Sequence, residues 1–146
     1  MAELVGVDTT FLVRADVRES QGHSEARGYL ENVVGAGKAQ LAVAPQILAE
    51  FLHVVTDPRR FERPLEMAEA LERADFWWRA REVVQVFPSA ASTEIFLDWM
   101  RQHRLGRKRL RDTQLAAIFA AGGIEKILSA NARDYEIFGC FKPAMD

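Results

Sequence analysis

Short apolar segments alternate with longer helical segments along this chain, and no other feature constrains its fold as strongly. The apolar runs suit single buried strands, whereas the segments between them repeat apolar residues at helical spacing. We expect strands at residues 4–7, 40–44, 83–87 and 126–129, with a fifth at the sheet edge at 137–141. We expect helices after Asp8, at 23–34, from Pro45 until Asp57-Pro58, from Pro64, after Pro88-Ser89 and at 113–121. This order predicts an α/β fold, a three-layer α/β/α sandwich around a mostly parallel sheet of about four to five strands.

The length and composition suit one domain. We interpret residues 1–146 as a single domain, because 49% of them are hydrophobic and no repeat or linker divides them. The formal net charge is −2, so attraction to an anionic polymer must come from a local patch. The single cysteine, Cys140, excludes an internal disulfide and a cysteine-based zinc cage. The first eight residues lack the basic segment and length of a signal peptide, so we expect a soluble, cytoplasmic protein.

Acidic and amide side chains fall where a parallel sheet brings separate segments together. Asp8 ends the first expected strand, and Asn131 and Asp134 follow the fourth. Asp112 begins the apolar helix that leads into the fourth strand, and Glu50 lies in the helix after the second. Open α/β sheets bind ligands at the carboxyl ends of their strands. Because converging carboxylates repel one another, the pattern predicts a hard divalent cation among them.

Each acid also has an ordinary structural explanation. Asp8 and Asp112 could each cap a helix, Asp134 could belong to a turn, and Glu50 could pair with an arginine. Glu50 and Asp112 lie beside apolar residues, where a carboxylate is costly unless a charged group meets it. The coincidence of four segments therefore favours one shared site.

A basic segment leads directly into Asp112. Six of the eleven residues from Arg101 to Arg111 are Arg or Lys, and none is acidic. The segment could be a helix C-terminus followed by a solvated loop. It could also be a rim that binds the phosphates of an RNA. The candidate RNA-binding residues are Arg107, Lys108, Arg109 and Arg111, to which Arg59 and Arg60 could add.

Other chemistries have less support. The chain has no glycine-rich nucleotide loop and no nucleophile elbow. The histidines His23, His53 and His103 lack paired ligand spacing, and Cys140 is expected to be an inert thiol. The tryptophans Trp77, Trp78 and Trp99 could stack on bases, but their helical spacing is more typical of a core or a subunit interface.

Four motifs in order resemble those of PIN-domain nucleases and, within that family, the VapC-type toxins of prokaryotic toxin–antitoxin pairs. They are Val7-Asp8-Thr9-Thr10, the segment 44–51 with Glu50, the segment 111–117 with Asp112, and the segment 127–135 with Asn131 and Asp134. The loop at 56–61 also resembles one common in these toxins. The fourth motif departs from the family pattern, because Ser129, Asn131 and Tyr135 stand where Thr, Asp and Phe are commoner.

The resemblance implies an endoribonuclease dependent on Mg²⁺ or Mn²⁺, with Asp8, Glu50 and Asp112 as the catalytic and metal-binding acids. Asn131 or Asp134 would supply a fourth ligand, directly or through water. A metal-activated water would attack the phosphorus of a structured RNA. The resemblance also implies a homodimer and a cognate antitoxin that blocks the site.

Two other functions stay open. One is a catalytically inactive PIN-like module that binds RNA or protein, although the loss of Asp8 or Asp112 that would indicate it is not seen. The other is a phospho-receiver switch, which requires paired acids after the first strand and an acceptor aspartate after the third. Here the first strand ends in Asp8 alone, and Phe87 is followed by Pro88, so the receiver is disfavoured.

Overall fold

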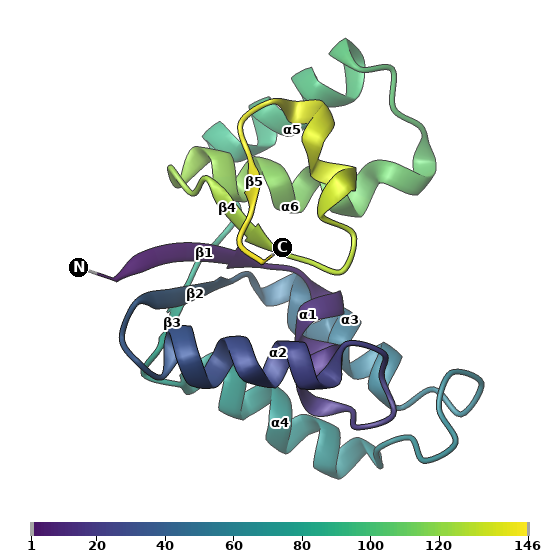
Figure 1. Cartoon of the computed structure of the whole chain (residues 1–146). Helices are drawn as coiled ribbons and strands as arrows, with labels where there is room; N and C mark the ends of the chain where they lie inside the picture. The colour runs from purple at the N-terminus through teal and green to yellow at the C-terminus, as the bar shows by residue number, and fades with distance from the viewer. Residues whose placement is uncertain (1, 146) are drawn as a thin grey trace.

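A five-stranded, entirely parallel sheet runs through the computed structural model, which describes residues 2–145 (Figure 1). The strand order is β3-β2-β1-β4-β5, so β1 lies at the centre, between β2 and β4. The strands are β1 (Glu3–Val7), β2 (Ala39–Val43), β3 (Val83–Gln85), β4 (Lys126–Leu128) and β5 (Lys142–Pro143). The α/β class and the five-stranded parallel sheet are confirmed.

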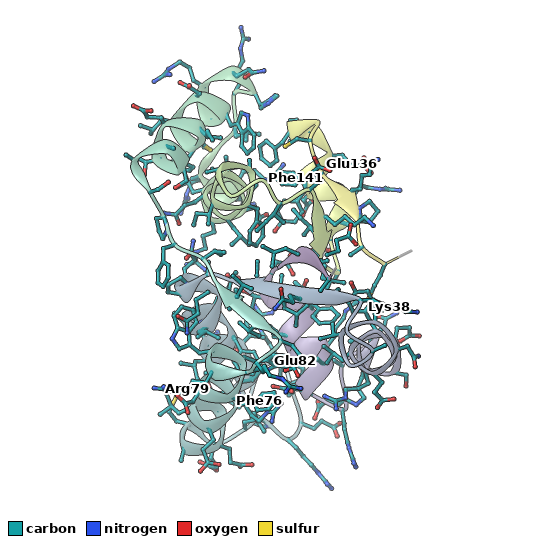
Figure 2. All side chains as sticks on the ribbon, turned by 90° about the vertical axis from the view of Figure 1, so that its left-hand side faces the viewer. Lys38, Phe76, Arg79, Glu82, Glu136 and Phe141 are labelled. Carbon is teal, nitrogen blue, oxygen red and sulfur yellow. The ribbon has the colours of Figure 1, made fainter. Side chains whose placement is uncertain are left out.

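Helices cover both faces of this sheet. Figure 1 shows α5 and α6 on one side and α1 to α4 on the other. Their bounds are α1 (Thr9–Asp16), α2 (His23–Tyr29), α3 (Pro45–Val55), α4 (Met67–Arg79), α5 (Ala90–Gln102) and α6 (Leu110–Ala121). A π-helical turn (Leu30–Val34) continues α2, and 3₁₀ turns occupy Arg107–Arg109 and Ala132–Phe138. Apolar side chains fill the space between the layers (Figure 2). Among the helices of residues 2–145, none combines the length and apolar character needed to cross a bilayer.

Local sequence signals set several helix starts. The Asp8 carboxylate accepts the Phe11 N–H at 3.4 Å and so caps α1. Pro45 is the first residue of α3, where a missing N–H costs nothing. Ser89 and Ser92 form a reciprocal capping box at the start of α5. These signals explain why α1, α3 and α5 begin close to the positions that the sequence predicts.

The prediction of a strand at residues 137–141 is wrong. Residues Ala132–Phe138 form a 3₁₀ helix, and the edge strand β5 starts later, at Lys142. Tyr135 and Phe138 are buried three residues apart, which is the spacing of a 3₁₀ turn and not of a strand. The Phe138 ring stacks on Trp99 with 4.4 Å between centroids, so the partly buried Trp99 packs against the core. Gly139 then ends the turn with a positive φ of 74°.

Smaller differences concern helix boundaries. The helix α6 begins at Leu110, so Asp112 lies in its first turn and is not its cap. The helix expected from Pro64 begins at Met67, and the one expected at 23–34 changes to π geometry from Leu30. Each difference shifts an element by a few residues and leaves the topology intact.

Gly6 allows α6 to approach the central strand closely. A Cβ atom at Gly6 would lie 2.6 Å from the ring of Phe119, which is fully buried. No side chain fits in that gap without moving the ring. Because Asp8 directly follows β1 and Asp112 lies in α6, this glycine also sets the separation between the elements that position these acids.

Replacing Gly6 with alanine should therefore lower the free energy of unfolding by roughly 1–3 kcal/mol, the usual cost of overpacking a core. Chemical denaturation of the purified protein would measure it. Gly28→Ala is the matched control, because a Cβ there meets nothing within 4 Å and Gly28 lies inside α2. That change should stabilise the protein by up to about 1 kcal/mol. Equal stability of Gly6→Ala and wild type would contradict the close approach.

A buried ion pair fastens α1 to α4. The Asp16 carboxylate, with only 4% of its side chain exposed, accepts two hydrogen bonds from the Arg73 guanidinium at 2.8 and 3.1 Å. It also accepts the Trp77 indole N–H at 2.7 Å. Trp77 is buried, so this tryptophan belongs to the core and is not a base-stacking side chain.

Candidate active site

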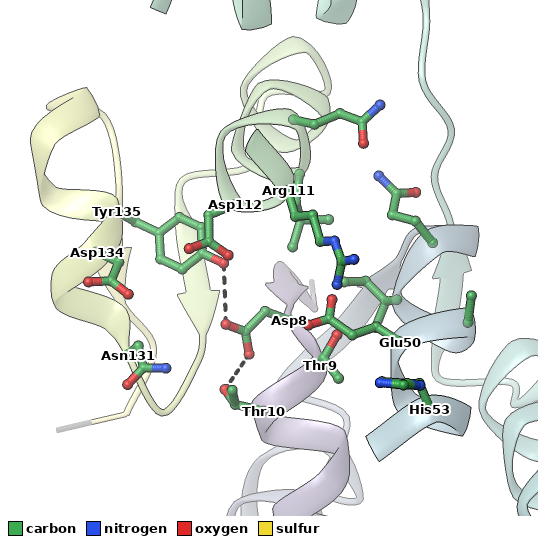
Figure 3. A pocket seen from close by; sticks show the side chains of 15 residues that line it. Asp8, Thr9, Thr10, Glu50, His53, Arg111, Asp112, Asn131, Asp134 and Tyr135 are labelled. Carbon is green, nitrogen blue, oxygen red and sulfur yellow. Dashed lines mark hydrogen bonds between the residues drawn. The ribbon is translucent and has the colours of Figure 1, made fainter. Parts of the chain in front are cut away.

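A cavity of about 540 Å³ lies at the carboxyl ends of β1 and β4 (Figure 3). It is lined by all five residues predicted to bind metal, which are Asp8, Glu50, Asp112, Asn131 and Asp134. They come from the end of β1, from α3, from α6 and from the segment after β4. The topology therefore brings together the four segments that the sequence singled out.

Asp8 is the most buried of these acids, with 7% of the residue exposed. One carboxylate oxygen accepts the Thr10 hydroxyl at 2.6 Å and the Phe11 N–H at 3.4 Å. The other accepts the hydroxyls of Ser129 and Tyr135, the latter at 3.2 Å. Figure 3 shows the bonds to Thr10 and Tyr135 as dashed lines. Asp8 is thus both a helix cap and a residue of the cavity, so the two interpretations of its role do not compete.

The hydroxyls around Asp8 are oriented by backbone amides. The Ala130 N–H donates to the Thr10 hydroxyl at 2.8 Å, and the Asn131 N–H donates to the Ser129 hydroxyl at 2.9 Å. Each hydroxyl thus accepts from the backbone and keeps its own hydrogen for the Asp8 carboxylate. The loop after β4 is fastened to Asp8 in this way.

Thr10, Ser129 and Tyr135 were not among the predicted site residues. Ser129 and Tyr135 drew attention only as departures from the family pattern, yet both donate to Asp8. The available signal was the run of hydroxyl groups at the ends of the first and fourth strands. His53 lines the cavity together with Glu50, one helical turn away.

Burial and mutual repulsion disturb the ionisation of the acids. Burial raises the pKa of Asp8 above its ordinary value, although its hydrogen bonds act in the opposite direction. Burial also raises the pKa of Asp112, followed by repulsion from Asp8, while Arg109 opposes both. Burial and the negative charge of Asp8 keep Tyr135 protonated, with its pKa far above the usual value. The cavity therefore favours a bound proton or cation.

The basic segment divides among three environments. Arg111 lines the cavity, and Figure 3 shows its side chain reaching from α6 toward Glu50 on α3. Arg109 donates to the carbonyl of Asp134 and lies 3.9 Å from the Asp112 carboxylate. Arg107 and Lys108 are exposed on the 3₁₀ turn before α6. Only Arg111 therefore faces the acids with its guanidinium in the cavity.

The chemistry of the donors fits a divalent cation. Carboxylate, amide and water oxygens are the ligands that hard cations take. The negative charges of Asp8, Glu50 and Asp134 each raise the pKa of Asp112, and a bound cation would relieve this repulsion. As the side chains of residues 2–145 stand, no three His, Cys, Asp or Glu are grouped closely enough to hold one ion. Glu50 and Asp112 are half-buried at the cavity wall. Rotation about their side-chain bonds would therefore be needed for them to share an ion with Asp8.

Known proteins resemble this chain over most of its length. A family model described as PIN domain matches residues 5–137. Ribonuclease VapC24 of Mycobacterium tuberculosis is 28% identical over 136 residues, which cover 93% of this chain and 92% of that protein.

Two solved structures show the same fold. VapC20 of Mycobacterium tuberculosis, described as a sarcin–ricin loop cleaving toxin, has a TM-score of 0.74 at 18% identity, covering 97% of this chain and 99% of that one. VapBC2 from Rickettsia felis, bound to a DNA fragment from its promoter, has a TM-score of 0.69 at 15% identity, covering 98% and 99%.

Proposed function

This chain belongs to the PIN domain family, and from that premise we propose that it is a metal-dependent endoribonuclease, the toxin of a type II toxin–antitoxin pair. The observation that carries the proposal is the convergence of the Asp8, Glu50 and Asp112 side chains on one cavity. The relative named Ribonuclease VapC24, similar over nearly the whole chain, supports the same activity.

The proposed catalytic acids are Asp8, Glu50 and Asp112, with Asn131 or Asp134 as a further oxygen ligand. A bound Mg²⁺ or Mn²⁺ would supply a water of lowered pKa and neutralise charge on the phosphate. Thr10, Ser129 and Tyr135 hold the Asp8 carboxylate in one orientation through their hydroxyls. Arg111 offers its guanidinium to a phosphate oxygen at the same cavity. Arg107 and Lys108 would hold the RNA backbone farther out, and Arg109 would support them from its place between Asp112 and Asp134.

The proposed biological setting is the bacterial cytoplasm, with a structured RNA as substrate and a cognate antitoxin as partner. Support for the partner comes from two VapBC structures that share this fold, from Rickettsia felis and from Haemophilus influenzae. A homodimer is proposed with it, on the resemblance to the VapC-type toxins.

The direct test is cleavage of a structured RNA by the purified protein with Mg²⁺ or Mn²⁺. Excess EDTA should stop the reaction, and added Mg²⁺ or Mn²⁺ should restore it. Gel analysis of end-labelled RNA would show internal cuts and not stepwise shortening. Binding of RNA with no metal-dependent cutting would favour the inactive binding module instead.

Metal binding can also be measured through stability. Mg²⁺ at about 100 times its dissociation constant should raise the free energy of unfolding by about 2.7 kcal/mol, because it binds only the folded state. Asp112→Asn should gain much less. Thermal melts of both proteins, with EDTA and with Mg²⁺, would measure the difference. An identical response in the two proteins would show that Asp112 is not a ligand.

The pH dependence of the EDTA-treated protein has a defined sign. The folded pKa values of Asp8 and Asp112 are raised, so at pH values above the ordinary pKa of 3.8 and up to these raised values the folded state keeps protons that the unfolded chain releases. The free energy of unfolding therefore falls as pH rises toward and through these raised values. The double variant Asp8→Asn/Asp112→Asn lacks both charges, so its free energy of unfolding should change less with pH in this range. Added Mg²⁺ should reverse the trend, because protons compete with the metal.

A further inference from the structure

A second cavity of about 610 Å³ adjoins the first and shares four lining residues with it, namely Thr9, Thr10, Glu50 and Asn131. Its other walls come from α1, from the turn after α1, from the end of α3 and from the loop before α4. The two hollows therefore form one continuous depression that passes beside Asp8. Glu50 and Asn131 line both cavities, whereas Asp8, Asp112 and Arg111 line the first alone.

The second cavity carries the chemistry of a nucleotide site. Arg14 and Arg60 provide two cations, and the half-buried ring of Phe61 provides an apolar aromatic surface. Arg14 lies against the turn at Gly22, where a Cβ would come within 2.7 Å of its guanidinium. Arg60 is exposed and lies 3.5 Å from the Asp57 carboxylate. Guanidinium groups suit phosphates, and aromatic rings suit bases of any sequence.

Hydrogen bonds hold the walls of this cavity in place. The Glu19 carboxylate accepts the N–H groups of Glu62 and Arg63 at 2.8 and 3.1 Å, which ties the turn after α1 to the loop that carries Phe61. The Asp57 carboxylate accepts the Arg59 N–H at 2.9 Å and fixes the other end of that loop. A preformed wall lowers the entropy cost of binding a ligand.

Two residues that line this cavity have buried hydroxyls without a hydrogen-bond partner among the described residues. Thr9 is 5% exposed, and its hydroxyl has no hydrogen-bond partner among the described residues. The Ser20 hydroxyl also has no hydrogen-bond partner among the described residues, and both Thr9 and Ser20 line the second cavity. Buried polar atoms are nearly always paired in folded proteins. Thr9 also lines the first cavity, so a ligand that satisfies it lies directly beside Asp8.

We propose that the second cavity is a subsite for the nucleotide next to the scissile phosphate of an RNA. Phe61 stacks on the base, Arg14 and Arg60 bind the backbone phosphate, and the Thr9 and Ser20 hydroxyls donate to acceptor atoms of the same nucleotide. The proposal rests on the nuclease function proposed above. It assigns to this cavity the recognition of an unpaired base, because a stacked, paired base would not expose its face to Phe61.

The first experiment measures binding without cutting. A fluorescein-labelled, mixed-sequence, single-stranded RNA is titrated with the protein in EDTA, and anisotropy gives the dissociation constant. Phe61→Leu should weaken binding about tenfold, the loss expected for one stacked base, whereas Phe61→Tyr should bind like wild type. Arg60→Ala should also weaken binding and reduce the slope of log K against log salt by about 0.7. Arg81→Ala is the control, since that side chain is 96% exposed and lies outside both cavities.

The second experiment reads the bases around the cut. An RNA library with a randomised unpaired loop is cleaved in Mg²⁺ or Mn²⁺, and the new ends are sequenced. Wild type should show a modest base preference at one position next to the cut, set by how strongly each base stacks, and Phe61→Leu should flatten that preference. The same variant should raise KM and leave kcat within about twofold, because Phe61 lies outside the cavity that holds Asp8 and Asp112.

The outcomes separate this proposal from the nuclease proposal. If wild type cuts RNA and both Phe61→Leu and Arg60→Ala match Arg81→Ala in binding and base preference, the subsite is overturned and the nuclease stands. If wild type binds RNA without cutting it and the two variants still bind more weakly, the subsite stands and the nuclease proposal fails. A wild-type protein that binds no RNA in EDTA overturns the subsite.

Discussion

Asp112→Asn should reduce the rate of RNA cleavage by at least about a hundredfold, because even residues that only support a metal ligand are worth roughly 10- to 100-fold. The substitution nearly preserves the shape of the side chain. It removes the charge of a half-buried carboxylate that neighbouring acids repel. Since Asp112 lies inside the first turn of α6 and caps nothing, the helix should remain intact. Initial rates with Mg²⁺, together with circular dichroism, would measure both effects.

The matched control is Asp98→Asn, an exposed aspartate on α5 that pairs only with Arg101. It should cut RNA at the wild-type rate. Asp8→Asn should lose activity as Asp112→Asn does, and because asparagine caps helices about as well as aspartate, α1 should keep its start. Wild-type cleavage by both acid variants would remove the assignment of these residues to the reaction.

Asp16→Ala should lower the free energy of unfolding, because Asp16 joins α1 to α4. The substitution leaves the Arg73 guanidinium and the Trp77 indole N–H without their acceptor. Breaking a fully buried pair costs about 3–5 kcal/mol. Arg73 keeps 37% of its side chain exposed and can turn toward water, so we expect a loss of roughly 2 kcal/mol. Denaturant titration would measure it as a lower midpoint with an unchanged slope.

Asp75→Ala is the control for this prediction, because it removes an exposed carboxylate from α4, the helix that carries Arg73. Asp75 pairs with Arg79 four residues later, and exposed pairs of this kind contribute about 0.3–0.5 kcal/mol. Asp16→Asn keeps one acceptor oxygen and should fall between the two. A cost for Asp16→Ala no greater than that for Asp75→Ala would show that α1 and α4 are not held together by this pair.

Much of the architecture could be predicted because its causes are local. The apolar run before Asp8 forms the central strand, and Pro45 opens α3 as expected. The edge strand at 137–141 could not be predicted correctly, because the spacing of Tyr135 and Phe138 matters only once Trp99 is known to pack against Phe138. A short apolar segment carries no sign of its distant packing partners.

The same difference between local and distant causes explains which residues of the site could be predicted. Asp8, Glu50 and Asp112 could be proposed because strand ends and helix faces can be read from the pattern, although their roles stay a prediction. The hydroxyls of Ser129 and Tyr135 could not be assigned, because their acceptor lies 121 and 127 residues away in the chain. The basic segment looks uniform in sequence, yet Arg109 and Arg111 meet different surroundings once α6 is in place.

The long separation in sequence between Asp8 and its hydroxyl donors Ser129 and Tyr135 has a consequence during synthesis of the chain. Asp8 leaves the ribosome 121 residues before Ser129 and 127 residues before Tyr135, whose hydroxyls donate to it, and also well before β4, which lies beside β1. A nascent chain that ends before β4 therefore lacks the neighbouring strand of β1 and the hydroxyl donors Ser129 and Tyr135, and only Thr10 can donate its hydroxyl to Asp8. The centre is assembled only after residue 135 has been made. Truncated translation products of this chain should therefore be harmless to the RNA around them.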